Sequence, residues 1–296
     1  IYIMSVQTIT FTGTGVLTQA IVNSLLPEEQ CNVIIEGYTS IGTSAFSYKA
    51  QIISLTIIGT SVTDIGYEIC YECENLTSVI IADSVITIGG WAFSNCISLA
   101  EVNLGNSVQY IDSNVFSWCA SLTSITIPKS CYSLGNEAFS YCSALETVNM
   151  DGGGSLLFLD QNVFADCTSL TAFTIPDSVR VIDSWSFSNC TSLTSIIIPS
   201  SVTEIYDNAF DDCNNLITVV IKNATTITTI LLRSFTNVST NSNSKIIFEN
   251  VSSLNELSAT WQTISGYYAT QVYEPTITFP NINATYGDAP QQIFYE

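Results

Sequence analysis

The chain has 296 residues, with 26 acidic side chains against 6 basic ones and no histidine, so its formal net charge is -20. DNA, RNA and anionic lipid are bound mainly through Lys and Arg on phosphates, so this charge excludes a nucleic-acid role. The absence of His also removes Ser-His-Asp and Cys-His catalysis and most catalytic zinc sites, and we expect a protein that is not an enzyme.

The apolar residues are spread over many short stretches. None reaches about 18 consecutive apolar residues, the length that a membrane-spanning helix needs, so no direct membrane insertion is expected. The N-terminus does not show a basic segment followed by an apolar run and a small-residue cleavage site. Met4 is a candidate initiator, and removal of a leader from a longer precursor is the alternative.

Residues 1–40 precede the repetitive part of the chain and are predicted to form its N-terminal cap. The strand-like VQTITFTG (6–13) is followed by a short helical stretch, TQAIVNSLL (18–26), which Pro27 ends. A second strand-like stretch, CNVIIEG (31–37), leads into the first repeat.

A repeat fills residues 41–238. Seven cysteines, which we call the ladder cysteines, return at intervals of 23, 23, 23, 25, 23 and 23 residues: Cys73, Cys96, Cys119, Cys142, Cys167, Cys190 and Cys213. Each is followed three residues later by Leu, and six and eight residues later by further apolar residues. Most are preceded by Phe three residues earlier, as at Phe93 and Phe187.

This spacing predicts a short strand after each ladder cysteine, because alternate side chains of a strand point to the same face. A Pro or Gly, such as Pro128 or Gly105, then ends the strand. The segment that leads up to the next cysteine, which we call the return leg, is too short for a long helix and is predicted to form one or two helical turns.

Stacking buries the apolar face that one repeat alone would expose, which predicts a solenoid with a parallel sheet along one side. The cysteine lies where the chain turns back into the core, and a small apolar side chain with a weak S–H donor suits that position. Cys31 and Cys131 lie outside the ladder, and Cys131 takes the place of a core Val. We expect mostly free thiols.

The repeat C-x2-L-x2-(V/I)-x-I-P-x2-V-x2-I-x4-A-F-x2-C closely resembles the BspA-like leucine-rich repeats of surface proteins from bacteria, parasitic protists and some giant viruses. The resemblance covers residues 41–238 and implies a leucine-rich-repeat solenoid with its parallel β-sheet on the concave face, short helical turns and loops on the return side, and a cap at each end. Lys49 stands where the first cysteine would be, Cys70 replaces the aromatic residue, and two extra residues fall around DGGGS (151–155).

The C-terminal residues lose the repeat. Residues 239–270 keep apolar strand-like stretches and are predicted to form the C-terminal cap. Residues 271–296 resemble a linker and the start of a bacterial-type Ig-like repeat, because a Thr-Ile-Thr-Phe strand is followed by Thr-Tyr-Gly-Asp. About twenty residues cannot form a sandwich of roughly seven strands, so we expect a further domain downstream and a longer, stalked protein.

Candidate chemical sites are few, and neither a metal nor a cofactor is expected. Cys70 and Cys73 have the spacing of a redox or metal pair, but Cys73 belongs to the ladder, Cys70 fills the Phe position, and no second pair completes four ligands. Core thiols are the preferred interpretation. Calcium at clustered carboxylates is an alternative, although no D-x-D-x-D-G loop is present.

The outward-facing strand positions lie four, five and seven residues after each ladder cysteine and form a polar, nearly uncharged stripe. One interpretation is a recognition strip, since solenoids bind partners along extended concave faces. The other is that Thr is simply a good solvent-facing strand residue. The residues predicted to contact a partner are Thr126, Asn149, Thr174, Ile197 and Val220.

Two further surfaces are candidates. Trp91, Trp118 and Trp185 lie on return legs in different registers, so they offer a second binding strip but not one stack. Of the N-x-S/T sequons, those at Asn75 and Asn189 adjoin the cysteine corners and are expected to be packed. The sequons predicted to accept glycans, if the chain visits a glycosylating compartment, are Asn223, Asn237 and Asn250.

The leading hypothesis is a non-enzymatic surface adhesion or recognition module that binds a protein or glycan on another surface, at the head of a longer stalked protein. The resemblance to BspA-like proteins implies this role and an extracellular or cell-surface location. The alternative is a structural component of a virion or cell-surface fibre, which would bind copies of itself and lie on the virion surface.

Overall fold

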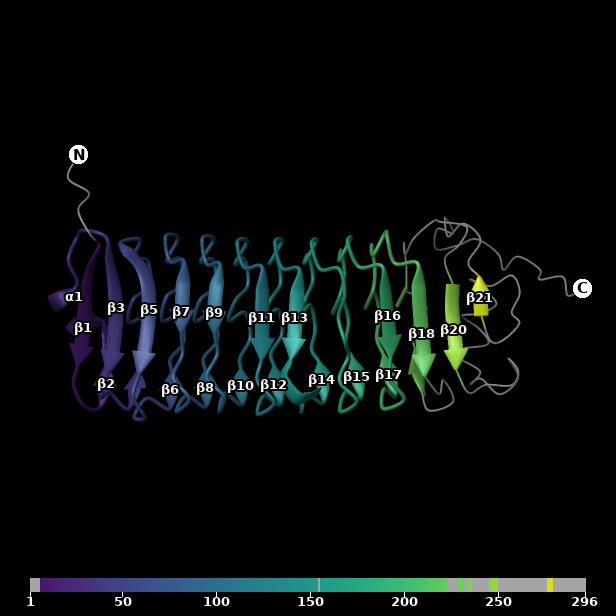
Figure 1. The fold of residues 1–296 in the computed structure, drawn as a ribbon, viewed down its shortest axis with the longest axis horizontal. Coiled ribbons are helices and arrows are strands. Elements are labelled where there is room, and N and C mark those ends of the chain that lie inside the picture. Colours follow the sequence, from purple (N-terminus) through teal and green to yellow (C-terminus); the bar gives the residue numbers. More distant parts are fainter. Residues whose placement is uncertain are drawn as a thin grey trace, which may run out of the picture. The chain divides into compact units, whose positions relative to one another are not determined.

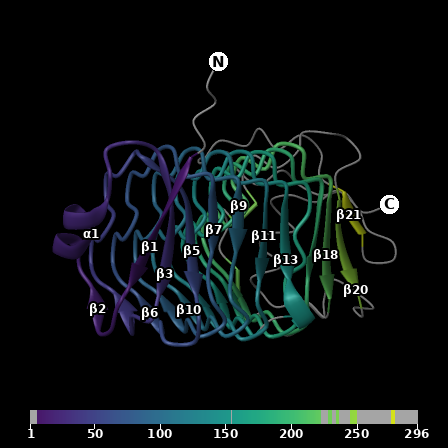
Figure 2. The same cartoon turned by 60° about the vertical axis from the view of Figure 1, so that its left-hand side comes forward.

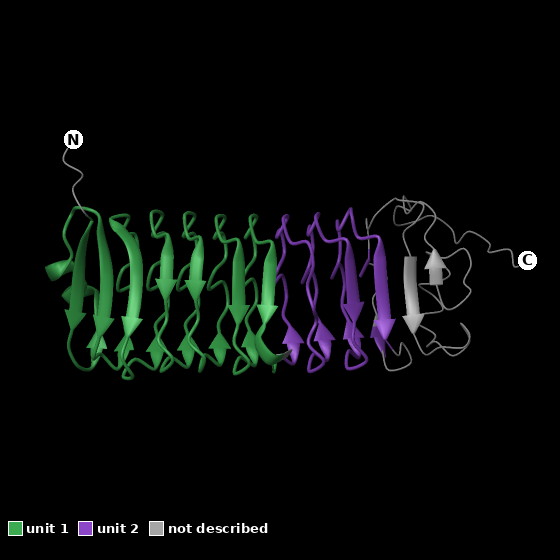
Figure 3. Cartoon of the chain, viewed as in Figure 1, with its two compact units in different colours: residues 1–155 green, residues 156–296 purple. Residues whose placement is uncertain are grey.

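The computed structural model describes residues 6–153, 155–222, 228–230 and 234–235, together with the backbone of strands 245–249 and 276–278. The chain divides into two compact units, Ile1–Ser155 and Leu156–Glu296, which Figure 3 shows in different colours. Each unit is a stack of repeats whose strands pair in parallel from one repeat to the next, so the predicted leucine-rich-repeat solenoid is confirmed.

The longer strands of the first unit form a parallel sheet in the order β1-β3-β5-β7-β9, and β11 and β13 form a further parallel pair (Figure 1). Each strand pairs with the same part of the next repeat; Val79 lies opposite Val102, for example. The bounds are β1 Gln7–Thr12, β3 Cys31–Glu36, β5 Ile52–Ile58, β7 Ser78–Ile80, β9 Glu101–Asn103, β11 Ser124–Ile127 and β13 Thr147–Met150.

Two-residue strands form the second sheet of this unit, in the order β12-β10-β8-β6-β4-β2. Each begins a return leg and inserts one aliphatic side chain, such as Ile88 or Ile111, into the core. The bounds are β2 Val16–Leu17, β4 Ser40–Ile41, β6 Asp64–Ile65, β8 Thr87–Ile88, β10 Tyr110–Ile111 and β12 Ser133–Leu134. The extra residues near DGGGS include a short 3-10 helix, Asp151–Gly153, in which Gly152 has a φ of 59°.

The predicted N-terminal elements are confirmed. The helix α1 (Gln19–Leu25) begins after Thr18, whose side chain accepts a hydrogen bond from the N–H of Ile21, and it ends before Pro27. Figure 2 shows α1 beside the first strands of the unit. Strand β1 pairs with β3, and β3 pairs with β5, so these two N-terminal strands extend the sheet of the repeats.

Rows of identical side chains fill the interior of the first unit. Phe93, Phe116 and Phe139 stack on one another in successive repeats, with ring centroids 5.5 Å and 5.4 Å apart. The Leu that follows each ladder cysteine is fully buried in every one of these repeats. Each repeat therefore covers the apolar surface of its neighbour, which is the main source of stability in a stacked solenoid.

The second unit repeats this plan. One parallel sheet has the order β14-β15-β17-β19, and the other has β16-β18-β20, with β21 antiparallel to β20. The rings of Phe187 and Phe210 stack 5.2 Å apart, and those of Phe210 and Phe235 5.0 Å apart. The bounds are β14 Phe158–Leu159, β15 Val181–Ile182, β16 Ser195–Ile198, β17 Glu204–Ile205, β18 Thr218–Lys222, β19 Thr229–Ile230, β20 Lys245–Glu249 and β21 Thr276–Thr278.

Two predictions for the C-terminal residues stay predictions. Strand β20 lies in the predicted C-terminal cap, residues 239–270, and β21 lies in the predicted linker and Ig-like segment, residues 271–296. The other residues of both segments lie outside the part of the chain that the structure describes.

The return legs correct one detail of the prediction. They turn, but within the described ranges they contain no α-helix: each consists of hydrogen-bonded turns after its two-residue strand, and the lengthened repeat adds the 3-10 helix Asp151–Gly153. Positive φ angles explain why: Glu68, Trp91 and Asn114 have φ values of 55°, 59° and 61°. All described non-glycine residues with positive φ lie five residues or one residue before a ladder cysteine or Lys49. A left-handed residue at each end of the leg interrupts any helix.

Hydrogen bonds join successive return legs in both directions. The N–H of Phe93 donates to the carbonyl of Val115 in the next repeat, at 2.9 Å. In the opposite direction, the S–H of Cys119 donates to the carbonyl of Phe93, at 3.2 Å. Further ladder bonds run from Cys73 to Phe46, Cys96 to Cys70, Cys142 to Phe116, Cys190 to Phe164 and Cys213 to Phe187.

Candidate recognition surface

The strand face presents alternating side chains to solvent. In β11, Ser124 and Thr126 are exposed while Ile125 and Ile127 are buried. The same alternation holds in β16, where Ile196 and Ile198 are buried. The core therefore uses only every second residue of these strands, and the residues between them are free to vary without disturbing it.

The five predicted contact residues lie in one register, seven residues after a ladder cysteine, and the structure places them in two groups. In the first unit, Thr126 and Asn149 are paired on neighbouring strands and both are exposed. In the second unit, Thr174 forms a bridge to Ile197, which pairs with Val220. Ile197 is 49% exposed, whereas Val220 is half-buried. That these residues bind a partner stays a prediction.

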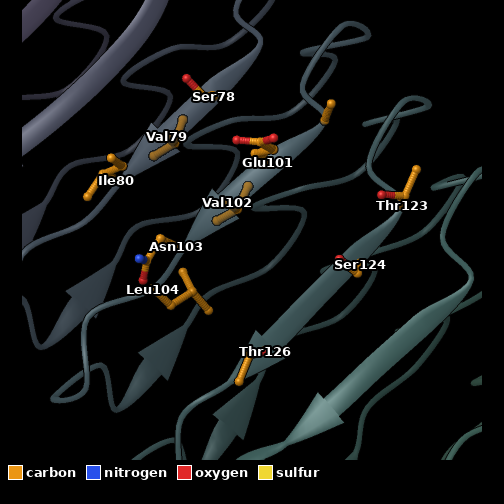
Figure 4. A pocket seen from close by; sticks show the side chains of 11 residues that line it. Ser78, Val79, Ile80, Glu101, Val102, Asn103, Leu104, Thr123, Ser124 and Thr126 are labelled. Carbon is orange, nitrogen blue, oxygen red and sulfur yellow. The ribbon is translucent and has the colours of Figure 1, made fainter.

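A hollow of about 620 Å³ opens on the strand face of the first unit, over β7, β9 and β11 (Figure 4). Its lining includes Thr126 from the predicted set and Asn103 and Ile80 from the same register. Sequence reasoning placed Asn103 and Ile80 on the outward face but did not select them. Nothing in the repeat pattern distinguishes these positions from their equivalents in other repeats.

The hollow lies where the pairing of the long strands is interrupted. Strands β7 and β9 are paired through Ser78 and Glu101, but β9 and β11 belong to different sheets. Elsewhere in the unit, the N–H of Ala100 donates to Thr77 and that of Glu146 to Thr123. No corresponding bond joins Thr123 to Ala100 in this described region. The side chain of Val102, at the centre of β9, is partly exposed as a result.

Gly105 lets the turn after β9 pack tightly against the turn after β7. A Cβ atom at this position would lie 2.2 Å from the carbonyl oxygen of Ala82, so only glycine allows the turn after β9 to pack against the turn after β7. The equivalent residue after β11 is Pro128.

The lining of the hollow suits hydrogen bonding to an uncharged partner. Hydroxyl groups of Ser78, Thr123 and Ser124 surround it, with the amide of Asn103 and apolar side chains between them (Figure 4). The one ionisable side chain in this lining is Glu101. These groups can donate to and accept from hydroxyl or amide groups, but they contain no nucleophile paired with a base.

The cysteines do not form a chemical site. All ten are free and buried. Burial raises the pKa of Cys70 well above its usual value and raises that of Cys131 to about 11. The thiolate is the form that attacks and binds metals, so these protonated thiols act as core residues. The described residues contain no cluster of three or more metal-binding side chains.

The tryptophans fall into separate groups, as their registers predicted. Trp91 contacts Tyr71, with ring centroids 6.1 Å apart. Trp118 stacks on Tyr141 at 3.9 Å, with the planes only 9° from parallel. Trp185, in the second unit, is 38% exposed. The contacts of Trp91 and Trp118 with neighbouring tyrosines could not be inferred from the sequence.

The sequons also fall into two groups. The amide nitrogen of Asn75 donates to the carbonyl of Ala50 at 2.8 Å, and that of Asn189 donates to the Asp166 carboxylate at 2.6 Å. Both amides therefore take part in contacts between repeats. The predicted glycan acceptors Asn223, Asn237 and Asn250 lie outside the described residues.

None of the helices in the described part of the chain combines the length and the apolar character that a membrane crossing requires.

Comparisons with known proteins show the family. Residues 39–157 and 157–265 match the model of the BspA type leucine rich repeat region, in six copies. A T. pallidum leucine rich repeat protein is 22% identical, with a TM-score of 0.48 and coverage of 65% of this chain and 80% of that one. A leucine rich cell surface protein from Faecalibacterium prausnitzii A2-165 is 22% identical, with a TM-score of 0.39 and coverage of 87% and 92%. The pneumococcal vaccine antigen PcpA is 15% identical, with a TM-score of 0.38 and coverage of 79% and 76%. No curated protein matches.

Proposed function

Because the chain belongs to the BspA-type leucine-rich repeat family, we propose that it is a non-enzymatic recognition or adhesion module, displayed on a cell surface, that binds a protein or glycan partner. Repeats of this family occur on bacterial and protist surface proteins, which supports the location. We call the outward-facing positions seven residues after each ladder cysteine the exposed strand row. The hollow over β7, β9 and β11 and the part of this row around it form the binding surface.

The observation that supports this proposal most is the interruption between β9 and β11. A solenoid is stabilised by regular contacts between neighbouring repeats, so a break in strand pairing lowers its stability. A surface exposed by such a break is therefore a candidate for a functional role. Here the break exposes part of Val102 between hydroxyl and amide groups. A partly apolar floor with mostly hydroxyl and amide walls, and Glu101 as the one carboxylate, fits sugar hydroxyls or peptide groups.

The experiment compares two matched double variants for binding to arrays of glycans and of surface-protein ectodomains. Asn103→Ala/Thr126→Ala removes an amide and a hydroxyl from the hollow. Asn23→Ala/Thr60→Ala removes the same groups from exposed positions elsewhere in the unit. We expect the hollow variant to lose about tenfold in affinity for its array partner, since each lost hydrogen bond costs about 0.5–1.5 kcal/mol, and the control to bind normally.

Equal binding by the two variants would contradict the proposal. A chain that sediments alone as fibres or defined oligomers, without binding to either array, would favour the structural-component alternative.

A further inference from the structure

A second exposed surface of the first unit lies on the return legs that precede β5, β7 and β9. Tyr48, Tyr71 and Trp91, which we call the aromatic row, come from three successive repeats and contact one another. The ring centroids of Tyr48 and Tyr71 are 5.5 Å apart, and those of Tyr71 and Trp91 are 6.1 Å apart, both in edge-to-face geometry. Tyr48 is 65% exposed, although apolar ring surface in water costs free energy.

Two carboxylates lie against the aromatic row. The pKa of Tyr71 is raised chiefly by a hydrogen bond to the Glu72 side chain, with smaller contributions from burial and from the charges of Glu72, Tyr48 and Glu68. The hydroxyl of Ser44 donates to the Glu68 carboxylate at 3.2 Å, which orients that carboxylate. The aromatic row therefore combines ring surfaces with two anionic groups.

Lys49, directly after Tyr48, is the one basic residue of these three return legs. Between Ala50 and Pro128 the sequence contains no Lys or Arg. The same stretch contains seven carboxylates: Asp64, Glu68, Glu72, Glu74, Asp83, Glu101 and Asp112. The faces of aromatic rings are also electron-rich, so rings and carboxylates attract the same kind of ligand.

The backbone holds these side chains in place. Tyr48, Glu72 and Trp91 have φ values of 63°, 56° and 59°, in the left-handed region. Hydrogen bonds between repeats fix these segments: the N–H of Tyr48 donates to Tyr71 at 2.8 Å, and that of Glu72 donates to Ser94 at 3.0 Å. A ligand therefore meets groups that are already ordered, which lowers the entropy cost of binding.

From this geometry we propose that the aromatic row, with Glu68 and Glu72, binds a basic segment of a partner protein. A Lys or Arg side chain lies over the rings and reaches the carboxylates with its charged end. This surface is separate from the hollow on the strand face, so either proposal can fail without the other. The Trp118–Tyr141 stack, whose rings face each other at 3.9 Å, lies on later return legs and serves as the comparison.

The test measures the fluorescence anisotropy of a labelled peptide of Lys-Ser-Gly repeats, titrated with the full chain at low salt. The same peptide with acetylated lysines keeps its length but loses its charge. We expect the lysine peptide to bind, and the acetylated peptide to bind at least about tenfold more weakly, because both cation–π and ion-pair contacts need the ammonium group.

Matched variants separate this site from general attraction to an acidic protein. We expect Glu68→Gln/Glu72→Gln to lower affinity by about tenfold and Trp91→Ala by about fivefold. Glu28→Gln/Glu29→Gln changes the net charge equally at an exposed pair elsewhere, and we expect little effect from it. Trp118→Ala removes a return-leg tryptophan outside the aromatic row and is expected to bind normally. Trp91→Phe keeps an aromatic ring, so it tests whether the affinity lost in Trp91→Ala results from misfolding or from loss of the ring.

Three outcomes would overturn the proposal. The first is that the Glu28→Gln/Glu29→Gln variant loses as much affinity as the Glu68→Gln/Glu72→Gln variant. The second is that Trp118→Ala loses as much affinity as Trp91→Ala. The third is that the acetylated peptide binds as well as the charged one. The last result would indicate that a neutral partner stacks on the rings.

Discussion

The interior rows and the exposed strand row of this protein follow opposite rules. Inside, successive repeats place the same residue at the same point, as with the stacked rings of Phe93, Phe116 and Phe139. On the strand face of the same unit, the register seven residues after each ladder cysteine changes from Ile80 to Asn103. A stack needs identical units where they touch each other, and it leaves the outward positions free to be chosen for a partner.

The largest expected effect concerns the buried thiols at high pH. A cysteine thiol has an ordinary pKa of about 9, and burial raises the pKa of Cys142 and Cys213 to about 12 in the folded protein. The stability contribution is therefore complete below pH 9 and is lost as pH rises from 9 towards 12, since only the unfolded thiol can ionise. Each such thiol removes about 1.4 kcal/mol per pH unit in that range, and several together unfold the protein.

This prediction is checked by the melting temperature of the full chain between pH 7 and pH 11. We expect no thiol contribution below pH 8.5 and a steep decline above pH 9. The Cys142→Ala variant has one such thiol fewer, so its decline is shallower. Parallel curves for the two proteins would show that the thiol at this position does not resist ionisation.

The next largest effect is a cavity in the interior row of the second unit. Phe187 is fully buried and contacts Phe210 and Phe173, with centroids 5.2 Å and 5.3 Å away. Phe187→Ala is expected to lower the free energy of unfolding by about 3–5 kcal/mol, measured by urea denaturation. The control is Ile197→Ala on the exposed row, for which a change within about 0.5 kcal/mol is expected. Similar losses in both variants would remove the distinction between the rows.

A smaller effect tests the S–H donors of the ladder. Cys119→Ala removes the bond to the Phe93 carbonyl and is expected to cost about 1–2 kcal/mol. Cys119→Ser keeps a donor of similar shape, so we expect it to be more stable than the Ala variant in the same denaturation experiment. If Ser is the less stable of the two, the cysteine serves packing alone.

Much of the fold could be predicted from the sequence because the repeat constrains it. The intervals between ladder cysteines set the strands, and Thr18 and Pro27 bound the one α-helix of the described residues. The left-handed return legs could not be predicted, because Ser44, Glu68 and Trp91 occupy one equivalent position and share no preference for positive φ. Contacts between repeats impose that conformation.

The candidate surface was predictable only in part. Alternation along the strands identified Thr126 as outward-facing, and the structure places it at the hollow. The hollow itself lies where the pairing between β9 and β11 is interrupted, and the sequence does not show this because the ladder cysteines keep the same 23-residue interval there. The aromatic row was also missed, because Tyr71 and Trp91 stand at different distances from their ladder cysteines.

The separation of interior from exposed row is tested most directly by the melting temperature of one combined variant, in which Thr126, Asn149 and Thr174 become Ala and Ile197 and Val220 become Thr. Five surface changes of at most about 0.5 kcal/mol each should together lower stability less than Phe187→Ala alone, so we predict that the combined variant melts above it. A combined variant that melts at or below the temperature of Phe187→Ala would contradict the account.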